Sequence, residues 1–313
     1  MKLVVFVPAL NEEKSISDVI LSIPRKIQGI DKVEVLVIDD GSKDKTVEVA
    51  LNAGADKIVS HPTNMGIGAA FMTGIRNCMS MGADIAVIID ADRQFDSKDI
   101  PKLVVPILNN QLDVVLGSRW LEHKVSGIPG RNLIGNKICT KLISIVTGQK
   151  FTDTQSGFVA YSKNAFSNIS VVNDFTFVHE AILDLKFKGF RMGEIGVPVK
   201  YFDERKSRVV KNVFNYGYRA LSIILKSMVF HRPIMTFGIL GILLVAGGIL
   251  AKIITISKIF GGGISSELSS GVIILGIVSF MLGLFANVVF KRQAFTERNI
   301  RYYMNDTKDN EKI

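Results

Sequence analysis

Short aliphatic runs alternate with longer amphipathic segments through roughly the first two hundred residues of this 313-residue chain. Five aliphatic runs have the length and composition of buried strands, and they lie at residues 3–7, 33–38, 57–60, 85–89 and 113–117. The segments between them carry apolar residues at helical spacing near residues 13–26, 44–53, 67–81 and 97–109. Continuous apolar strands separated by helices predict an α/β fold, with a mainly parallel sheet that has helices on both faces. The opening run, MKLVVFVPAL, is too short for a signal sequence and is interpreted as the first strand.

Two long apolar runs near the C-terminus add a second kind of structure. Neither PIMTFGILGILLVAGGILA (Pro233–Ala251) nor GVIILGIVSFMLGLFANVVF (Gly271–Phe290) contains a charged residue, and they account for the high mean hydropathy of +0.30. At 1.5 Å per residue, each run is about long enough to cross a hydrocarbon layer of ~30 Å. A buried core helix is the alternative, but two such runs close together favour a two-helix transmembrane hairpin.

The basic residues around these runs predict an orientation in the membrane. His231 and Arg232 precede the first run, and four basic residues follow the second: Lys291, Arg292, Arg298 and Arg301. The charged residues between the two runs are only Lys252, Lys258 and Glu267. By the positive-inside tendency, both ends of the hairpin and the large domain face the cytoplasm. Cys78 and Cys139 form no close-spaced motif, which suits a reducing compartment.

The net charge of +9 could indicate a nucleic-acid partner, but its placement favours a membrane instead. Every charged side chain from Arg205 to Arg232 is basic, and apolar residues interleave with these side chains at roughly helical spacing. This pattern predicts an amphipathic helix on an anionic lipid surface, with a core-facing helix as the alternative. The predicted organisation is an α/β domain over residues 1–203, an interface helix over 204–232, two membrane spans over 233–291 and a polar cytoplasmic tail over 292–313. The final stretch, NDTKDNEKI, is expected to lack regular structure.

Polar clusters follow the first four predicted strands: PALNEE, DDGSKD, NMGIGAA and DADRQF. Ligands of open parallel sheets bind beyond the carboxyl ends of the strands, so these clusters predict one binding site at one edge of the sheet.

The cluster DADRQF places Asp90, Asp92 and Gln94 directly after an aliphatic strand. Carboxylates packed this closely repel one another, and hard oxygen ligands at this spacing suit Mg²⁺ or Mn²⁺ bridging to substrate phosphates. The alternative is the acid-rich start of a helix, which explains Asp96 and Asp99 but not Asp90. We therefore expect a metal site here.

Three other clusters each allow a binding role and a structural role. Asp39 lies where an acid can accept a hydrogen bond from a base or a ribose, whereas Ser42 or Asp44 could simply cap the next helix. Gly66 and Gly68 precede a helix and would permit a phosphate to approach the backbone, although such turns are common. Two arginines, Arg119 and Arg131, follow the fifth strand and suit an anionic substrate. Asp153 either lines the site or forms an Asx turn.

In their order along the chain, PALNEE, VIDDGSKDKT, NMGIGAA, DADRQF, GSRWL and TDTQSGF resemble the motifs of the family 2 glycosyltransferases, which have a GT-A fold. The resemblance covers about residues 1–230 and is greatest to the sugar transferases that act on polyprenyl or dolichyl phosphate. It implies a GT-A catalytic domain over residues 1–203, a nucleotide-sugar donor, a lipid monophosphate acceptor and inversion at the sugar. GDP-mannose is the first choice of donor, followed by UDP-glucose and UDP-N-acetylglucosamine.

The resemblance also assigns roles to individual residues. The metal, Mg²⁺ or Mn²⁺, would be held by Asp90, Asp92 and Gln94. The nucleotide sugar would contact Pro8, Asn11, Glu12, Asp39, Asp40, Asn64, Gly66, Asp90 and Ala91. The acceptor phosphate would be bound by Arg119, Arg131, Arg205 and Ser207. Asp92, Arg119 and Arg131 are the candidate catalytic residues.

Three positions depart from the motifs of that family. Leu10 stands where an aromatic residue is common, and Arg93 stands where a small or apolar residue is common. In the late basic element ERKSRV, Arg205 takes the place of a glycine, while Ser207 and Arg208 match the end of the motif.

The sequence also allows neighbouring functions. A processive polysaccharide synthase is disfavoured, because Leu116 replaces the glutamine of the Gln-x-x-Arg-Trp motif ahead of Arg119 and Trp120. A transferase with a hydroxyl acceptor would need a base, for which Asp153 or Glu180 is the candidate. A phosphate acceptor needs no base, in keeping with the absence of histidine from the metal cluster; His179 and Glu180 are interpreted as structural. A membrane-tethered nucleotide-binding protein without turnover is the non-enzymatic alternative.

Overall fold

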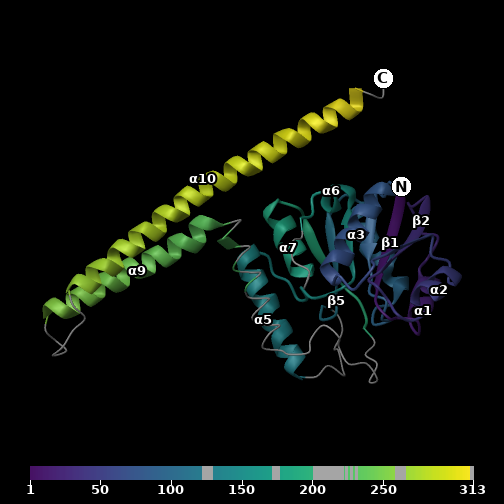
Figure 1. Ribbon diagram of the computed structural model, residues 1–313, viewed down its shortest axis with the longest axis horizontal. Helices are drawn as coiled ribbons and strands as arrows, with labels where there is room; N and C mark the ends of the chain where they lie inside the picture. Colours follow the sequence, from purple (N-terminus) through teal and green to yellow (C-terminus); the bar gives the residue numbers. More distant parts are fainter. Residues whose placement is uncertain are drawn as a thin grey trace. The chain divides into compact units, whose positions relative to one another are not determined.

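The computed structural model describes residues 1–121, 130–170, 177–199, 222, 225, 228–229, 232–257 and 266–310. The chain divides into two compact units, Met1–Ile224 and Leu225–Ile313 (Figure 1). The first unit contains a β-sheet with its covering helices, and the second contains a pair of long helices. Most of the predicted interface helix, including Arg205 and Ser207, lies outside the described residues.

The first unit is built on a seven-stranded sheet with the strand order β3-β2-β1-β4-β6-β5-β7. The strands are β1 (Lys2–Ala9), β2 (Lys32–Asp39), β3 (Lys57–Ser60), β4 (Ile85–Ile88), β5 (Val114–Ser118), β6 (Val159–Ser162) and β7 (Met192–Gly196). All neighbouring pairs are parallel except those of β6, which runs antiparallel between β4 and β5. The five predicted strands are confirmed within one or two residues at most ends. Strand β7 was not predicted, because its sequence MGEIG combines two glycines with a charged residue.

Helices cover both faces of the sheet, as predicted (Figure 1). They are α1 (Ile16–Ser22), α2 (Thr46–Asn52), α3 (Ile67–Ser80), the 3₁₀ turn η1 (Ser97–Asp99), α4 (Ile100–Leu108), α5 (Gly130–Thr147), α6 (Lys163–Phe166) and α7 (Val178–Phe187). Alternate residues of β1 serve the two faces: Val5 packs in one cluster with α1 and α4, whereas the Phe6 ring lies 5.9 Å from Phe71 of α3. Phe71 also stacks on Phe177 at 4.2 Å, which ties the start of α7 to the same face.

The strand directions bring distant segments to one edge of the sheet. Strands β1, β2, β4 and β5 end at this edge, and the antiparallel strand β6 begins there. The loops that meet at this edge therefore include residues 10–12, 40–42, 89–94 and 119–121, together with the segment 153–158 that leads into β6. We call this the site edge.

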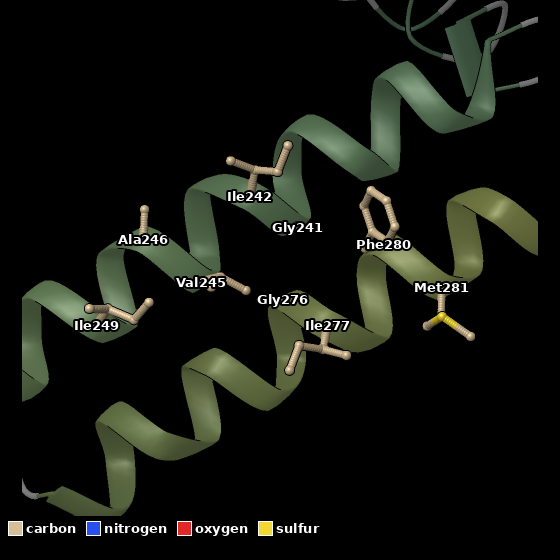
Figure 2. A pocket seen from close by; sticks show the side chains of 9 residues that line it. All are labelled: Gly241, Ile242, Val245, Ala246, Ile249, Gly276, Ile277, Phe280 and Met281. Atoms are coloured by element: carbon tan, nitrogen blue, oxygen red, sulfur yellow. The ribbon is translucent and has the colours of Figure 1, made fainter.

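The second unit contains α9 (Pro233–Ser257) and the longer α10 (Ser266–Asn310), and α9 packs against the first half of α10. Residues 233–256 and 266–292 are each long and apolar enough to cross a membrane. The helices approach most closely at two glycines, because a Cβ atom on Gly241 would lie 2.6 Å from the carbonyl oxygen of Gly276. Figure 2 shows the apolar groove at this approach, lined by side chains that include Val245 and Phe280.

The expectation that NDTKDNEKI lacks regular structure is wrong for most of that stretch, because α10 continues to Asn310. The sequence after Gly283 contains no glycine or proline up to that residue, so nothing in it ends the helix earlier.

Candidate functional site

The loops after β1 and β2 interlock at the site edge. The backbone N–H of Asn11 donates to Ser42 Oγ at 2.8 Å, and Asn11 Oδ1 accepts from the N–H of Lys43 at 2.8 Å. The N–H of Glu12 donates to Thr46 Oγ1 at 2.7 Å. Pro8 is buried within β1 just before this junction. The first two motifs therefore form one rigid wall, and the side-chain oxygen of Asn11 is part of that wall.

Asp39 and Asp40 are adjacent and buried, but they serve different neighbours. Asp39, 3% exposed, ends β2 and accepts from the N–H of Ser42 at 3.1 Å, which shapes the turn that follows. Asp40, 5% exposed, accepts from the N–H of Met65 and the N–H of Gly66, both at 2.9 Å. Asp40 also pairs with His61 Nδ1 at 2.8 Å. Asp40 thus joins the ends of β2 and β3 to the start of α3.

Gly66 does begin a helix, as expected, since it precedes α3 with φ 94°, a left-handed value that favours glycine. Its N–H is already bonded to Asp40, and Asn64 Oδ1 accepts from the same N–H at 3.0 Å. In this arrangement the Gly66 N–H is engaged by the chain's own carboxylate. The contact of Gly66 with the nucleotide sugar stays a prediction.

Asp90 follows β4 and has a different environment from Asp40. Its carboxylate makes no hydrogen bond or ion pair with any described residue, and desolvation raises the pKa of Asp90 to about 6, although Arg119 opposes this shift. The carboxylate lies against Gly157, where a Cβ atom would fall 2.0 Å from Asp90 Oδ2. Only glycine fits at position 157 beside this carboxylate. The contact restricts the position of the Asp90 carboxylate without supplying a positive charge.

The residues after Asp90 turn sharply around Asp92. The N–H of Gln94 donates to Asp92 Oδ1 at 3.0 Å, and Arg93 between them adopts the left-handed φ of 61°. The Arg93 side chain is exposed and pairs with Asp18 of α1 at 2.5 Å. This placement explains how an arginine is accommodated next to Asp92. The acids further on do start a helix, because Asp96 accepts from the N–H of Lys98 at the start of η1.

The side-chain oxygens available at this loop are ligands that suit a hard divalent cation. An unpartnered carboxylate in a desolvated position is costly unless a positive charge meets it. In the described ranges, no cluster of three or more His, Cys, Asp or Glu side chains is placed to hold a metal by itself. An ion held by Asp90 and Asp92, beside the buried Ala91, would therefore complete its coordination with substrate phosphates and water, as Mg²⁺ commonly does.

Arg119 and Asp153 form a buried ion pair at the other side of the site edge. Arg119 Nε lies 2.6 Å from Asp153 Oδ2, and Nη2 lies 2.8 Å from Oδ1. The N–H of Gln155 also donates to Asp153 at 3.1 Å, which is the predicted Asx turn. Because Asp153 is 1% exposed and both of its oxygens are engaged, it is not placed to act as a general base. Arg131 lies in the first turn of α5, and its side chain is outside the described set.

Glu194 supports this ion pair and was not singled out from the sequence. Its carboxylate accepts from the N–H of Thr152 at 2.8 Å and from the N–H of Asp153 at 2.7 Å. Burial raises the pKa of Glu194, while the two N–H groups oppose that shift. The only local signal was a charged residue within an otherwise small and apolar segment.

His179 lies in the first turn of α7 and is fully buried. Neither Nδ1 nor Nε2 has a hydrogen-bond partner among the described residues, and burial lowers the pKa of His179 to about 4. Its imidazole is therefore neutral at physiological pH and, as expected, belongs to the interior and not to the metal cluster.

Comparison with known proteins identifies the fold and the family of this arrangement. Residues 4–170 match the profile of glycosyl transferase family 2. The chain is 30% identical over 239 residues to the UDP-N-acetylglucosamine–dolichyl-phosphate N-acetylglucosaminyltransferase of Methanococcus voltae, which spans 69% of this chain and 94% of that relative. The chain belongs to glycosyl transferase family 2.

Two further family 2 similarities are informative. The chain is 29% identical over 226 residues to a dolichol-phosphate mannosyltransferase of Pyrococcus furiosus, which covers 70% of this chain and 58% of the relative. It is 27% identical over 198 residues to a dolichyl-phosphate hexose transferase of Haloferax volcanii, covering 63% and 82% respectively.

The fold also matches a solved structure. Glucosyl-3-phosphoglycerate synthase of Mycobacterium tuberculosis, solved with Mn²⁺, UDP-glucose and phosphoglyceric acid, superposes with a TM-score of 0.58 at 23% identity over 72% of this chain and 79% of that one. The first unit of this glycosyltransferase therefore has the GT-A type of fold that its sequence motifs predicted.

Proposed function

We propose that this family 2 glycosyltransferase transfers a hexose from a nucleotide sugar to a polyprenyl or dolichyl monophosphate, with inversion at the sugar. The observation that carries the proposal is the joining, in one chain, of a family 2 unit and two helices of membrane length. The relatives named for dolichyl-phosphate transfer support the lipid acceptor. They differ in the sugar, so the donor is proposed as GDP-mannose first, then UDP-glucose or UDP-N-acetylglucosamine.

In this proposal the site edge binds the donor across two loops. Asp39 would accept from the base or ribose, and the wall that contains Asn11 and Glu12 would enclose the nucleoside. Asp90, Asp92 and Gln94 would hold Mg²⁺ or Mn²⁺. When bound, that ion would neutralise charge on the departing nucleoside diphosphate.

The acceptor supplies its own nucleophile. A phosphate monoester has a second pKa of about 6, so it is largely dianionic at neutral pH and needs no general base. This agrees with Asp153 being engaged by Arg119 instead of being available as a base. Arg131, with Arg205 and Ser207, would bind the acceptor phosphate, and Arg119 would maintain positive charge beside Asp90. The remaining catalytic requirement is positioning and charge stabilisation.

The exposed residues of α5 support contact between the catalytic unit and a lipid surface. Ile138 and Ile145 lie two helical turns apart and are 55% and 61% exposed, and the exposed Lys137 and Lys141 accompany them. The helix contains no acidic residue. Apolar and basic side chains on one exposed helix are typical of contact with anionic headgroups. We propose that the catalytic unit faces the cytoplasm, because basic residues flank the outer ends of the two spans.

The direct test is a transfer assay with the full chain in nanodiscs, Mg²⁺, polyprenyl phosphate and each of the three radiolabelled donors in turn. We expect one donor to yield a labelled lipid that is stable to mild base and labile to mild acid. Label transferred only to water, or transfer that persists with all divalent ions chelated, would contradict the proposal.

Arg131→Ala separates the acceptor role from the donor role. Loss of a charge-assisted contact to the acceptor phosphate should raise the acceptor KM about tenfold. The donor KM should change less than twofold. Equal effects on both KM values would show that Arg131 does not act on the acceptor.

A further inference from the structure

His61 lies at the centre of a hydrogen-bonded chain that the metal site and the acceptor arginines do not use. Its Nδ1 lies 2.8 Å from Asp40 Oδ1, and its Nε2 lies 3.0 Å from Thr73 Oγ1 of α3. The side chains of His61 and Asp40 are only 9% and 7% exposed. The chain therefore crosses from the end of β2, through the residue after β3, to the second turn of α3.

The hydrogen-bonding properties of Asp40, His61 and Thr73 determine which group donates in each bond. An ionised carboxylate only accepts, so the hydrogen of a neutral imidazole belongs on Nδ1. Nε2 is then an acceptor, and the Thr73 hydroxyl donates to it. Each group has the partner that its neighbours require, which holds the Asp40 carboxylate in one orientation.

That orientation fixes the loop 63–66. The same two oxygens of Asp40 that His61 orients also accept the N–H groups of Met65 and Gly66. The loop 63–66 lies directly against the turn after Asp39, since a Cβ atom at Gly41 would be 2.6 Å from the carbonyl carbon of Thr63. A displaced loop would therefore disturb the turn that begins at Asp39.

We propose that His61 is a positioning residue for nucleoside binding: through Asp40 it holds loop 63–66 against the Asp39–Ser42 turn, so that Asp39 is presented to the donor. This inference rests on the proposed function, since it takes Asp39 as the nucleoside contact. It gives the two adjacent aspartates different roles, with Asp39 as the proposed nucleoside contact and Asp40 fixing the loop. The ligand class concerned is a nucleoside diphosphate.

The test measures binding of GDP and of UDP to the full chain in nanodiscs with Mg²⁺. His61→Leu removes both hydrogen bonds, and we expect it to weaken binding of the preferred nucleotide about tenfold. His61→Asn places an amide N–H near the position of Nδ1 and should recover most of that loss, because the bond to Asp40 is retained. Thr73→Val removes only the far bond and should weaken binding about twofold. The acceptor KM should be unchanged in all three variants.

A matched control separates positioning from general loss of stability. Arg25 pairs with Asp56, which accepts the N–H of Val35 of β2 at 2.7 Å, away from the site edge. Arg25→Leu should lower the unfolding temperature while leaving nucleotide affinity unchanged.

The outcomes distinguish this inference from the proposed function. If the wild-type chain binds neither nucleotide, the proposed function is wrong and the inference with it. If the wild-type chain binds one of them and His61→Leu binds equally well, or if Arg25→Leu weakens binding to the same extent, His61 has only a structural role.

Discussion

Two aspartates at the site edge, Asp40 and Asp90, meet opposite surroundings. Asp40 accepts hydrogen bonds from His61 and from two backbone N–H groups, so both of its carboxylate oxygens are compensated by donors of the chain. Asp90 makes no hydrogen bond or ion pair within the described part of the chain, and desolvation raises its pKa. A compensated carboxylate stabilises the fold, whereas an uncompensated one is tolerated where a ligand completes it. The number of hydrogen-bond partners within the chain therefore distinguishes a structural aspartate from one that is available to a ligand.

The largest expected effect tests the proposed metal loop that begins at Asp90. Asp92→Ala removes a carboxylate from the proposed metal loop, and transfer should fall by about 10³-fold, because charge on the leaving group is no longer stabilised. Circular dichroism and the unfolding temperature should remain those of the wild type. Asp31→Asn, a surface substitution just before β2, serves as the control with full activity. Product formation by Asp92→Ala at the wild-type rate would remove the basis for a metal loop.

His179 extends the comparison to a buried base. Its pKa is lowered to about 4 in the folded chain from about 6.5 when unfolded, so only the unfolded chain takes up a proton between these values. The stability that His179 contributes is present above pH 6.5 and is lost as the pH falls towards 4, by at most about 3 kcal/mol. Denaturant unfolding of wild type and His179→Leu across this range gives the contribution as the difference between two curves. Parallel curves would show that His179 is partnered in solution.

Gly157→Ala tests whether Asp90 must occupy its observed place. The added methyl group would collide with the carboxylate, so the Mg²⁺ concentration for half-maximal activity should rise about 10²-fold. Gly135→Ala is the matched control, because a Cβ atom there meets no heavy atom within 4 Å. Unchanged Mg²⁺ dependence in Gly157→Ala would mean that the position of Asp90 does not determine metal binding.

The smallest expected effects test the comparison of Asp40 with Asp90 directly, because the free energy of unfolding should change in opposite directions. Asp40→Asn should lower the free energy of unfolding by about 2 kcal/mol, since an amide cannot accept from all three donors. Asp90→Asn should raise it by about 1 kcal/mol at pH 7.5 without metal, since an amide needs no counter-charge. Chemical unfolding of both variants under the same conditions measures the pair. A loss of stability in both would place Asp90 among the structural carboxylates.

Local periodicity was enough to predict most of the sheet and the edge at which the polar loops gather. The strands β1 to β5 are continuous aliphatic runs, and the polar residues after them, such as Asp39 and Asp90, necessarily meet where parallel strands end. Strand β7 was not predicted because Gly193 and Glu194 give no apolar period. The antiparallel insertion of β6 was also unpredictable, since it depends on pairing with β4 and β5, which are distant in sequence.

Contacts between distant side chains set the roles within the site. Arg119 is bound to Asp153, and Gly66 is bound to Asp40, and neither pairing has a local signal in the sequence. The motif alone would assign Arg119 and Gly66 to the substrate. In the structure each of them is at least partly engaged by another residue of the chain. The motifs thus indicate which residues gather at the site edge, while only the structure shows where each side chain points.

The reversed direction of β6 has a consequence for how the enzyme matures during synthesis. Strands β4 and β5 are separated in the sheet by a strand that leaves the ribosome after both of them. A nascent chain that ends at Ser118 already contains the first three strands and the loops that follow them, yet it has no Gly157 beside Asp90 and no Asp153 for Arg119. In the proposed function, the part of the site edge that would receive the base is therefore built from strands made early, and the part that would hold the metal is completed last, by the insertion of β6.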